Sequence, residues 1–264
     1  MRAHLRIFFL AVLICASTFP AHAVEPIETD GPDFVDSSEA VGKDRLQIEA
    51  DFVSERSGRD GALRRSVSTP MLARYGISEN FELRVDGTLQ VHETTRDGGI
   101  DSTASGHGDI SLGFKWHTQD RDQATNTPAV CWIFDLNTPT GSENFRGHGL
   151  RPGLRSVITW DLPDDFSLGA MPGVIHDSRA DGQRFTSAIL GIILGKRLSE
   201  RFRVFVESAS SQIAHAEDGG VVSAWDVGAG YLLTKDVQIA SRFAVGANRN
   251  SPAKTLIVEL AVRF

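Results

Sequence analysis

The last ten residues of the chain, Thr255 to Phe264, alternate between two kinds of side chain with a period of two. Successive side chains of an extended strand point to opposite faces, so this period sorts the residues onto two sides. One side carries Glu259 and Arg263, and the other consists of Leu256, Val258, Leu260, Val262 and Phe264. Charges require water or a charged partner, whereas the second side requires an apolar surrounding. A chain built from such strands has to separate the two environments.

The same alternation recurs from Arg45 onward. Its clearest instance lies between Phe81 and Val91, where apolar residues alternate with Glu82, Arg84 and Asp86. Polar or glycine-rich connections separate about twelve such segments, and bacterial single-chain outer-membrane barrels have an even number of strands. We therefore predict an all-β fold over residues 44–264: an antiparallel transmembrane β-barrel of the outer-membrane type with about twelve strands.

The connections between these segments alternate in length. Outer-membrane barrels have short periplasmic turns and longer external loops, whereas a soluble β-sandwich has no reason to alternate. Thr118 to Thr127 is long where a short turn is expected and breaks the rule. The short connections begin at Gly76, Asp161, Leu198 and Thr234, and the mostly long ones begin at Glu55, His92, Thr138, His176, Ser210 and Asn248.

Four aromatic residues support the same topology. Tyr75, Trp116, Trp160 and Tyr231 all lie near the strand ends that this topology assigns to the periplasmic side. Tyrosine and tryptophan prefer the interface between lipid and water. We therefore expect these residues to mark one rim of the barrel, although each could also pack inside a sandwich.

The N-terminus has the pattern of a secretory signal peptide over residues 1–23. Arg2 and Arg6 precede the apolar run from Ile7 to Ala16, and Ala21-His22-Ala23 is a small-x-small cleavage site. The run is too short for a membrane anchor, which needs about 20 residues. We predict export to the cell outer membrane after cleavage near Ala23.

Residues 24–43 are acidic and rich in proline, glycine and serine. They show neither the period of a strand nor that of a helix, which predicts a mobile leader.

The composition excludes some partners and cross-links. The net charge of −7 argues against nucleic acid and anionic lipid as partners. Removal of the signal peptide takes away Cys15 and leaves Cys131 as the remaining cysteine, so no intramolecular disulfide can form. Stability has to come from elsewhere, and a closed hydrogen-bonded sheet would supply it.

Four short motifs stand out along the chain: RYGISENFELRV (74–85), GHGDISLGFKW (106–116), NTPTG (137–141) and VGAGYLLTKDVQIA (227–240). In this order and spacing, they resemble the outer-membrane "transporter" family of the meta-pathway of phenol degradation. The resemblance covers most of the chain after the signal peptide and implies a membrane barrel that passes hydrophobic or aromatic compounds. The C-terminal strand likewise resembles the closing strand of outer-membrane barrels, whose assembly machinery recognises a terminal aromatic residue such as Phe264.

Motifs that would indicate a metal site or a catalytic site are weaker. Two Gly-His-Gly triplets, at 106–108 and 147–149, fall in or beside predicted external loops. They could supply paired metal ligands, but glycines that serve turns and solvated histidines explain them more simply. Asp109 is expected to cap loop amides. The chain lacks G-x-S-x-G and H-E-x-x-H, so we predict no catalytic residues, no metal and no cofactor.

Charged residues of both signs fall on the predicted lumen face. They suit either a water-filled channel or a lumen closed by mutual ion pairs, since about twelve strands enclose an interior between filled and open. The residues are Glu49, Asp51, Arg74, Glu82, Arg84, Asp86, Lys115, Asp135, Arg155, Arg203, Glu207, Asp226, Arg242, Glu259 and Arg263.

Three functions are therefore expected in decreasing order. The first is a channel that passes a small solute, and the second is a structural or surface-interaction barrel whose long loops bind partners. The third is a lipid hydrolase of the outer membrane. The expected partners are outer-membrane lipid, the barrel-assembly machinery through the C-terminal strand, and a small-molecule solute.

Overall fold

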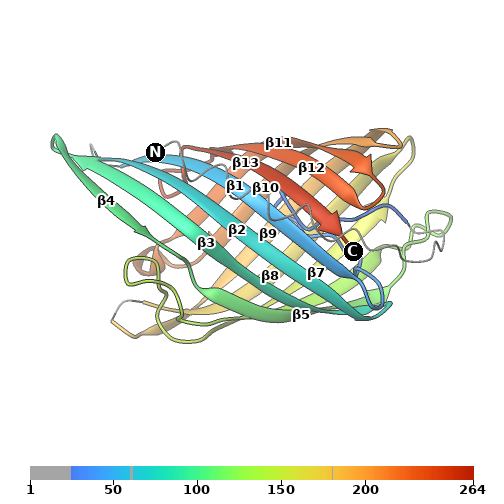
Figure 1. The fold of residues 1–264 in the computed structure, drawn as a ribbon, viewed down its shortest axis with the longest axis horizontal. Coiled ribbons are helices and arrows are strands. Elements are labelled where there is room, and N and C mark those ends of the chain that lie inside the picture. Colours follow the sequence, from blue (N-terminus) through green and yellow to red (C-terminus); the bar gives the residue numbers. More distant parts are fainter. Residues whose placement is uncertain (1–24, 60–61, 180) are drawn as a thin grey trace.

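The computed structural model of the protein describes residues 25–59, 62–179 and 181–264, and the predicted signal peptide lies outside them. The described residues form one antiparallel sheet that closes on itself (Figure 1). Within these ranges no helix is long and apolar enough to cross a membrane. The strands are β1 (Leu46–Arg59), β2 (Ala62–Ser78), β3 (Phe81–Asp97), β4 (Ile100–Gly106), β5 (Ile110–Gln119), β6 (Ala129–Asn137), β7 (Arg151–Asp161), β8 (Phe166–Ser178), β9 (Arg184–Ser199), β10 (Phe202–Ile213), β11 (Val221–Thr234), β12 (Val237–Gly246) and β13 (Lys254–Arg263).

The barrel is closed where β1 pairs with β13. At this seam the amide of Phe264 donates to the carbonyl of Leu46 at 2.8 Å, and Asp51 lies directly opposite Glu259. Closure matters because hydrocarbon offers no hydrogen bonds, so a sheet edge left open in the bilayer would be costly.

Thirteen segments make twelve wall strands, which confirms the predicted fold. β5 pairs with the first half of β3, and β4 pairs with its second half. β4 and β5 are therefore one strand interrupted at residues 107–109. The carboxylate of Asp109 accepts hydrogen bonds there from the amides of Gly141 and Gly147, at 2.8 and 2.9 Å. Asp109 thus caps loop amides as expected and ties loop 138–150 to the interruption.

The structure differs from the sequence prediction in the length of several loops. The stretch from His92 to Gly106, predicted as a loop, is mostly a hairpin of β3 and β4. β1 and β8 likewise run past the predicted strand ends at Glu55 and His176. The reason is that both faces of a strand beyond the bilayer meet water. Such a strand needs no apolar period, and its hydrogen bonds alone hold it.

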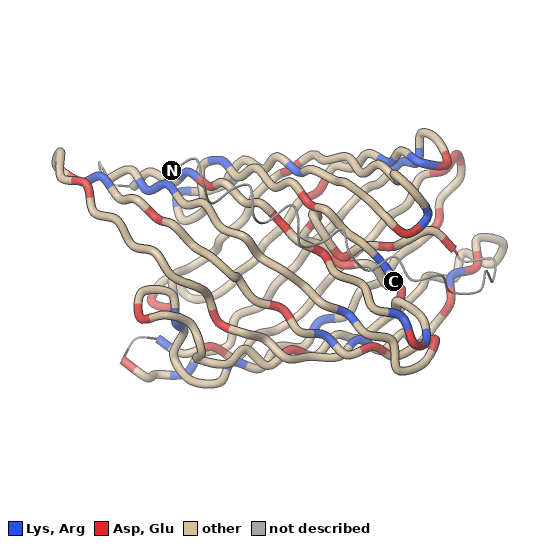
Figure 2. Tube along the Cα trace, in the orientation of Figure 1, with Lys and Arg blue, Asp and Glu red and all other residues tan. Residues whose placement is uncertain are grey.

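Apolar residues cover the outside of the barrel. Leu83 and Val85 on β3 are each 47% exposed, whereas their neighbours Glu82 and Arg84 are 0% and 4% exposed. Figure 2 shows charged residues along the strands and at both ends of the molecule. This arrangement inverts that of a soluble domain and is the one expected of a wall that faces lipid.

The predicted aromatic rim lies at the end with the short turns. Trp116 stands opposite Phe81, the first residue of β3, and Tyr231 opposite Phe202, the first residue of β10. Trp116 and Tyr231 are exposed, at 53% and 43%. Both therefore face outward near the turns, as aromatic girdles of membrane barrels do.

A charge on the outer face should prevent insertion. We expect Val85→Arg to lose most of its folded form, because an arginine at the bilayer mid-plane of a barrel costs about 2–4 kcal/mol. The measurement is heat-modifiable gel migration after refolding into vesicles. Arg84→Leu, one position away on the lumen side, should still insert. Equal folding of the two variants would contradict this assignment of faces.

Candidate functional site

The lumen is the candidate site, and every predicted lumen residue is buried or half-buried in the structure. Those that are buried are Glu49, Arg74, Glu82, Arg84, Lys115, Asp135, Glu207, Asp226 and Glu259, and those that are half-buried are Asp51, Asp86, Arg155, Arg203, Arg242 and Arg263. Sequence reasoning missed other inward polar residues, among them Gln47, His117 and Gln238, which are all less than 5% exposed.

Residues 25–44, which we name the inner segment, occupy this lumen. The sequence predicted a mobile leader for residues 24–43, and the structure instead places the described part of it inside the barrel. Ile27, Val35 and Val41 are 4–5% exposed. The amide of Ile27 donates to the carbonyl of Lys235 at 2.7 Å. Low hydrophobicity led to the leader interpretation, but this segment is held by the charges of the wall rather than by a core of its own.

One side of the lumen presents cations to the inner segment. Asp30 pairs with Lys115 at 2.6 Å, with Arg74 at 3.4 Å and also with Arg84. These cations come from β5, β2 and β3. The burial of Asp30 favours its neutral form, but the three positive charges outweigh it and hold its pKa well below the ordinary value. Asp30 is therefore the residue of the inner segment on which most of these charges converge. We name the charged wall residues that contact the inner segment the seat: they are Glu49, Arg74, Glu82, Arg84, Lys115, Arg155, Arg203 and Glu207.

The guanidinium of Arg74 has a hydrogen-bond acceptor for each of its donors. Its side chain is fully buried and pairs with Glu82 at 2.7 Å and with Glu49 at 3.0 Å. It also donates to the backbone carbonyls of Glu28 and Glu39, at 3.1 and 2.8 Å. A buried guanidinium has five N–H donors to satisfy. Here the wall and the inner segment satisfy them together.

The wall of the lumen also presents carboxylates, which accept hydrogen bonds from the backbone of the inner segment. Glu49 on β1 accepts from the amides of Asp30 and Gly31, at 2.9 and 3.1 Å. Glu207 on β10 accepts from the amides of Phe34 and Val35, at 2.9 and 2.8 Å. Each carboxylate thus satisfies two consecutive amides of a segment that belongs to no strand.

Further pairs extend the seat along the segment. Asp36 lies 3.3 Å from Arg155 of β7, and Asp33 lies 3.2 Å from Arg203 of β10. A sequence signal for these contacts existed: an acidic residue stands at every third position from Asp30 to Glu39. The signal is a repeat of charge, which analysis of apolar periods does not detect.

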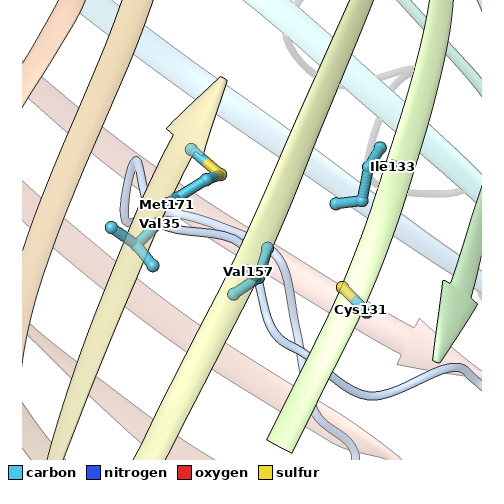
Figure 3. Close-up of a cluster of buried hydrophobic side chains, with 5 residues drawn as sticks. All are labelled: Val35, Cys131, Ile133, Val157 and Met171. Atoms are coloured by element: carbon cyan, nitrogen blue, oxygen red, sulfur yellow. The ribbon is translucent and has the colours of Figure 1, made fainter. Parts of the chain in front are cut away.

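A small apolar cluster also anchors the inner segment. Val35 packs against side chains of β6, β7 and β8, with Phe34 and Ile193 beside it. Figure 3 shows the valine among these strands. The wall residues of this cluster are Cys131, Ile133, Val157 and Met171, all 0% exposed. The free thiol of Cys131 is thus part of the packing.

A cavity of about 650 Å³ remains between the inner segment and the end of the barrel with the short turns. Its lining includes Glu28, Asp33, Arg121, Arg203 and Arg263. The inner segment therefore lies in the lumen and leaves a polar vestibule at one end.

The histidine motifs do not assemble a site in the described part of the chain. His107 and His148 are exposed. No group of three or more His, Cys, Asp or Glu side chains among the described residues could hold a metal ion. The chemistry that this lumen offers is the pairing of charges and the donation of hydrogen bonds.

Comparisons with solved structures show the fold of outer-membrane barrels. The COG4313 outer membrane channel from Pseudomonas putida F1 is 13% identical, with a TM-score of 0.66 over 89% of this chain and 99% of the other. The beta domain of the Bordetella autotransporter BrkA is 11% identical, with a TM-score of 0.56 over 82% of this chain and 98% of the other. A comparison with curated proteins found no match.

A family model matches residues 29–264, a range that begins within the inner segment and includes the whole barrel. The family is the one that the sequence motifs resembled. The chain belongs to the family described as "Putative MetA-pathway of phenol degradation".

Proposed function

We propose that the protein is an outer-membrane channel for small solutes and that the inner segment closes its lumen. The observation that carries this proposal is the seat itself. The inner segment crosses the lumen, yet in residues 25–44 it belongs to no strand and is held by side chains of the wall. It can therefore leave without breaking any hydrogen bond between the strands of the barrel.

The contacts of the seat suit a reversible closure. Most are ion pairs and hydrogen bonds to charged groups, such as those of Asp30 with Lys115 and of Val35 with Glu207. Water can replace such partners once the segment moves, so the net cost of opening is far below the sum of the contacts. The vestibule at the end with the short turns gives the segment space into which it can shift.

For the solute we propose a small hydrophobic or aromatic compound. The family description supports this class. So does the lumen, where the apolar patch of Ile133, Val157 and Met171 lies beside charged groups. A ring that carries a polar substituent would meet a partner of each kind along this path.

The second candidate is a structural barrel that conducts nothing. The completeness of the seat around Arg74 favours it, because a fully paired interior can serve stability alone. The two candidates differ in one respect: the channel requires the inner segment to move, and the structural barrel does not.

Loss of the charge at the centre of the seat should open the channel. We expect Asp30→Asn to raise the mean conductance in planar bilayers at least tenfold, because removal of one partner of a buried ion pair costs about 3–5 kcal/mol and each 1.4 kcal/mol is about tenfold in population. The inner segment should also become sensitive to added protease. Asp101→Asn removes the same charge from an exposed pair with Arg96 and should change neither property. A variant Asp30→Asn that stays silent would favour the structural barrel.

A reversible cross-link should lock the channel. A Cβ atom at Gly191 would lie 2.5 Å from Cγ2 of Val35, which places the two Cβ atoms within about 4 Å, the separation that a disulfide requires. We expect Val35→Cys with Gly191→Cys, in a Cys131→Ser background, to block solute flux into vesicles when oxidised and to regain it on reduction. The single variant Gly191→Cys in the same background is the control. Equal flux in the oxidised and reduced states would contradict closure by this segment.

A further inference from the structure

Two carboxylates of the lumen face each other across the seam that closes the barrel. Asp51 on β1 and Glu259 on β13 are direct partners in the register of the two strands. Both side chains point inward, Glu259 being 1% exposed and Asp51 half-buried. Like charges directly opposite each other on neighbouring strands destabilise a sheet. The pairing of Asp51 with Glu259 therefore destabilises the seam unless a positive charge neutralises the two carboxylates.

No side chain among the described residues neutralises this pair. Neither carboxylate has a lysine, arginine or histidine nitrogen within 4.0 Å in the part of the chain that the structure describes. Both carboxylate oxygens of Glu259 and Oδ1 of Asp51 are buried and accept no hydrogen bond. The carboxylates of the inner segment at positions 30, 33 and 36 each have a cation within 4.0 Å, so the unmatched acceptors of Asp51 and Glu259 call for a positive partner.

A second opposed pair shows the contrast. Glu207 and Asp226 are direct partners on β10 and β11. Arg242 of β12 lies 3.4 Å from the first and 3.8 Å from the second. Glu207 also accepts two amides of the inner segment. The chain thus supplies a cation within 4.0 Å of this second pair, whereas among the described residues none lies within that distance of Asp51 or Glu259.

The surroundings of the unmatched pair are mainly acidic. Glu49 stands two positions before Asp51 on β1 and therefore on the same face of the strand. The two cations of this neighbourhood are engaged elsewhere, since Arg203 is paired with Asp33 at 3.2 Å and Arg242 with Glu207 at 3.4 Å. The field at the pair is therefore negative, and a mobile cation would lower it.

The inner segment covers this pair. Gly31 lies so close to Glu259 that a side chain at position 31 would overlap its carboxylate. The amide of Gly31 is bound to Glu49 at 3.1 Å. When the segment shifts, as the proposed function requires, the carboxylates of Glu259 and Asp51 face the open lumen together.

We propose that Asp51 and Glu259 form a binding step for a small cation of single positive charge on its way through the lumen. This inference rests on the proposed channel function. Two carboxylates bind such a cation by charge and by accepting its hydrogen bonds or replacing its water. They are too few for a tight metal centre, and no group of three or more metal-binding side chains exists in the described ranges. The shared chemistry fits an alkali ion or the ammonium head of an organic solute.

The test is the charge selectivity of the full-length protein in planar bilayers under a salt gradient. The wild-type channel should prefer cations over anions. We expect Asp51→Asn and Glu259→Gln each to reduce the permeability ratio of cation to anion at least threefold. Potassium chloride and ethylammonium chloride are used in parallel. A larger loss with potassium identifies an alkali ion as the natural occupant, and a larger loss with ethylammonium identifies an amine.

The control is Asp101→Asn, which removes an equal charge far from the lumen and should leave the ratio unchanged. Heat-modifiable migration verifies that each variant folds. Since Asp51 is half-buried on a different strand, its variant tests the pair even where Glu259→Gln does not fold. Normal currents with an unchanged ratio in both salts would overturn the cation site alone. The absence of any current in the wild type and in Asp30→Asn would instead overturn the channel function and this step with it.

Discussion

The structure depends on one constraint: a backbone that crosses hydrocarbon must satisfy every N–H and C=O group within the protein. A β-sheet meets this constraint only when it closes, because any edge would leave a row of unpaired groups. The seam between β1 and β13 is therefore as essential as any pair in the sheet. Closure also creates an inside, and all of the functional features of this protein follow from how that inside is filled.

Period two then divides the side chains between lipid and lumen. A residue such as Val85 gains by facing hydrocarbon, and its neighbour Arg84 gains by facing charges across the interior. The hydrophobic effect places the wall in the membrane, whereas ion pairs and hydrogen bonds to charged groups organise the lumen. In a soluble domain these two roles are reversed, which is why buried arginine is rare there and common here.

The inner segment makes the lumen specific. A barrel with so many inward charges but no segment would hold water and unpaired ions. With the segment in place, Asp30 pairs with three cations at once, and Glu49 and Glu207 accept hydrogen bonds from backbone amides that belong to no strand. The same arrangement leaves Oδ1 of Asp51 and both carboxylate oxygens of Glu259 without a hydrogen-bond partner among the described residues. The proposed closure of the channel and the proposed cation step thus rest on one arrangement of charge.

The amino-acid order by itself determined the fold class and the approximate strand count, because alternation is a local property that any extended strand expresses. It also indicated the family through short motifs. The hairpin of β3 and β4 escaped prediction, since beyond the bilayer both faces of a strand are wet and no period is imposed. The inner segment escaped it for a different reason. Asp30 meets Arg74, Arg84 and Lys115 only because closure brings β2, β3 and β5 around one point, and a charge pattern on one segment does not specify where its complement lies. Which charges pair, and which carboxylates remain unpaired, was decided by the tertiary structure.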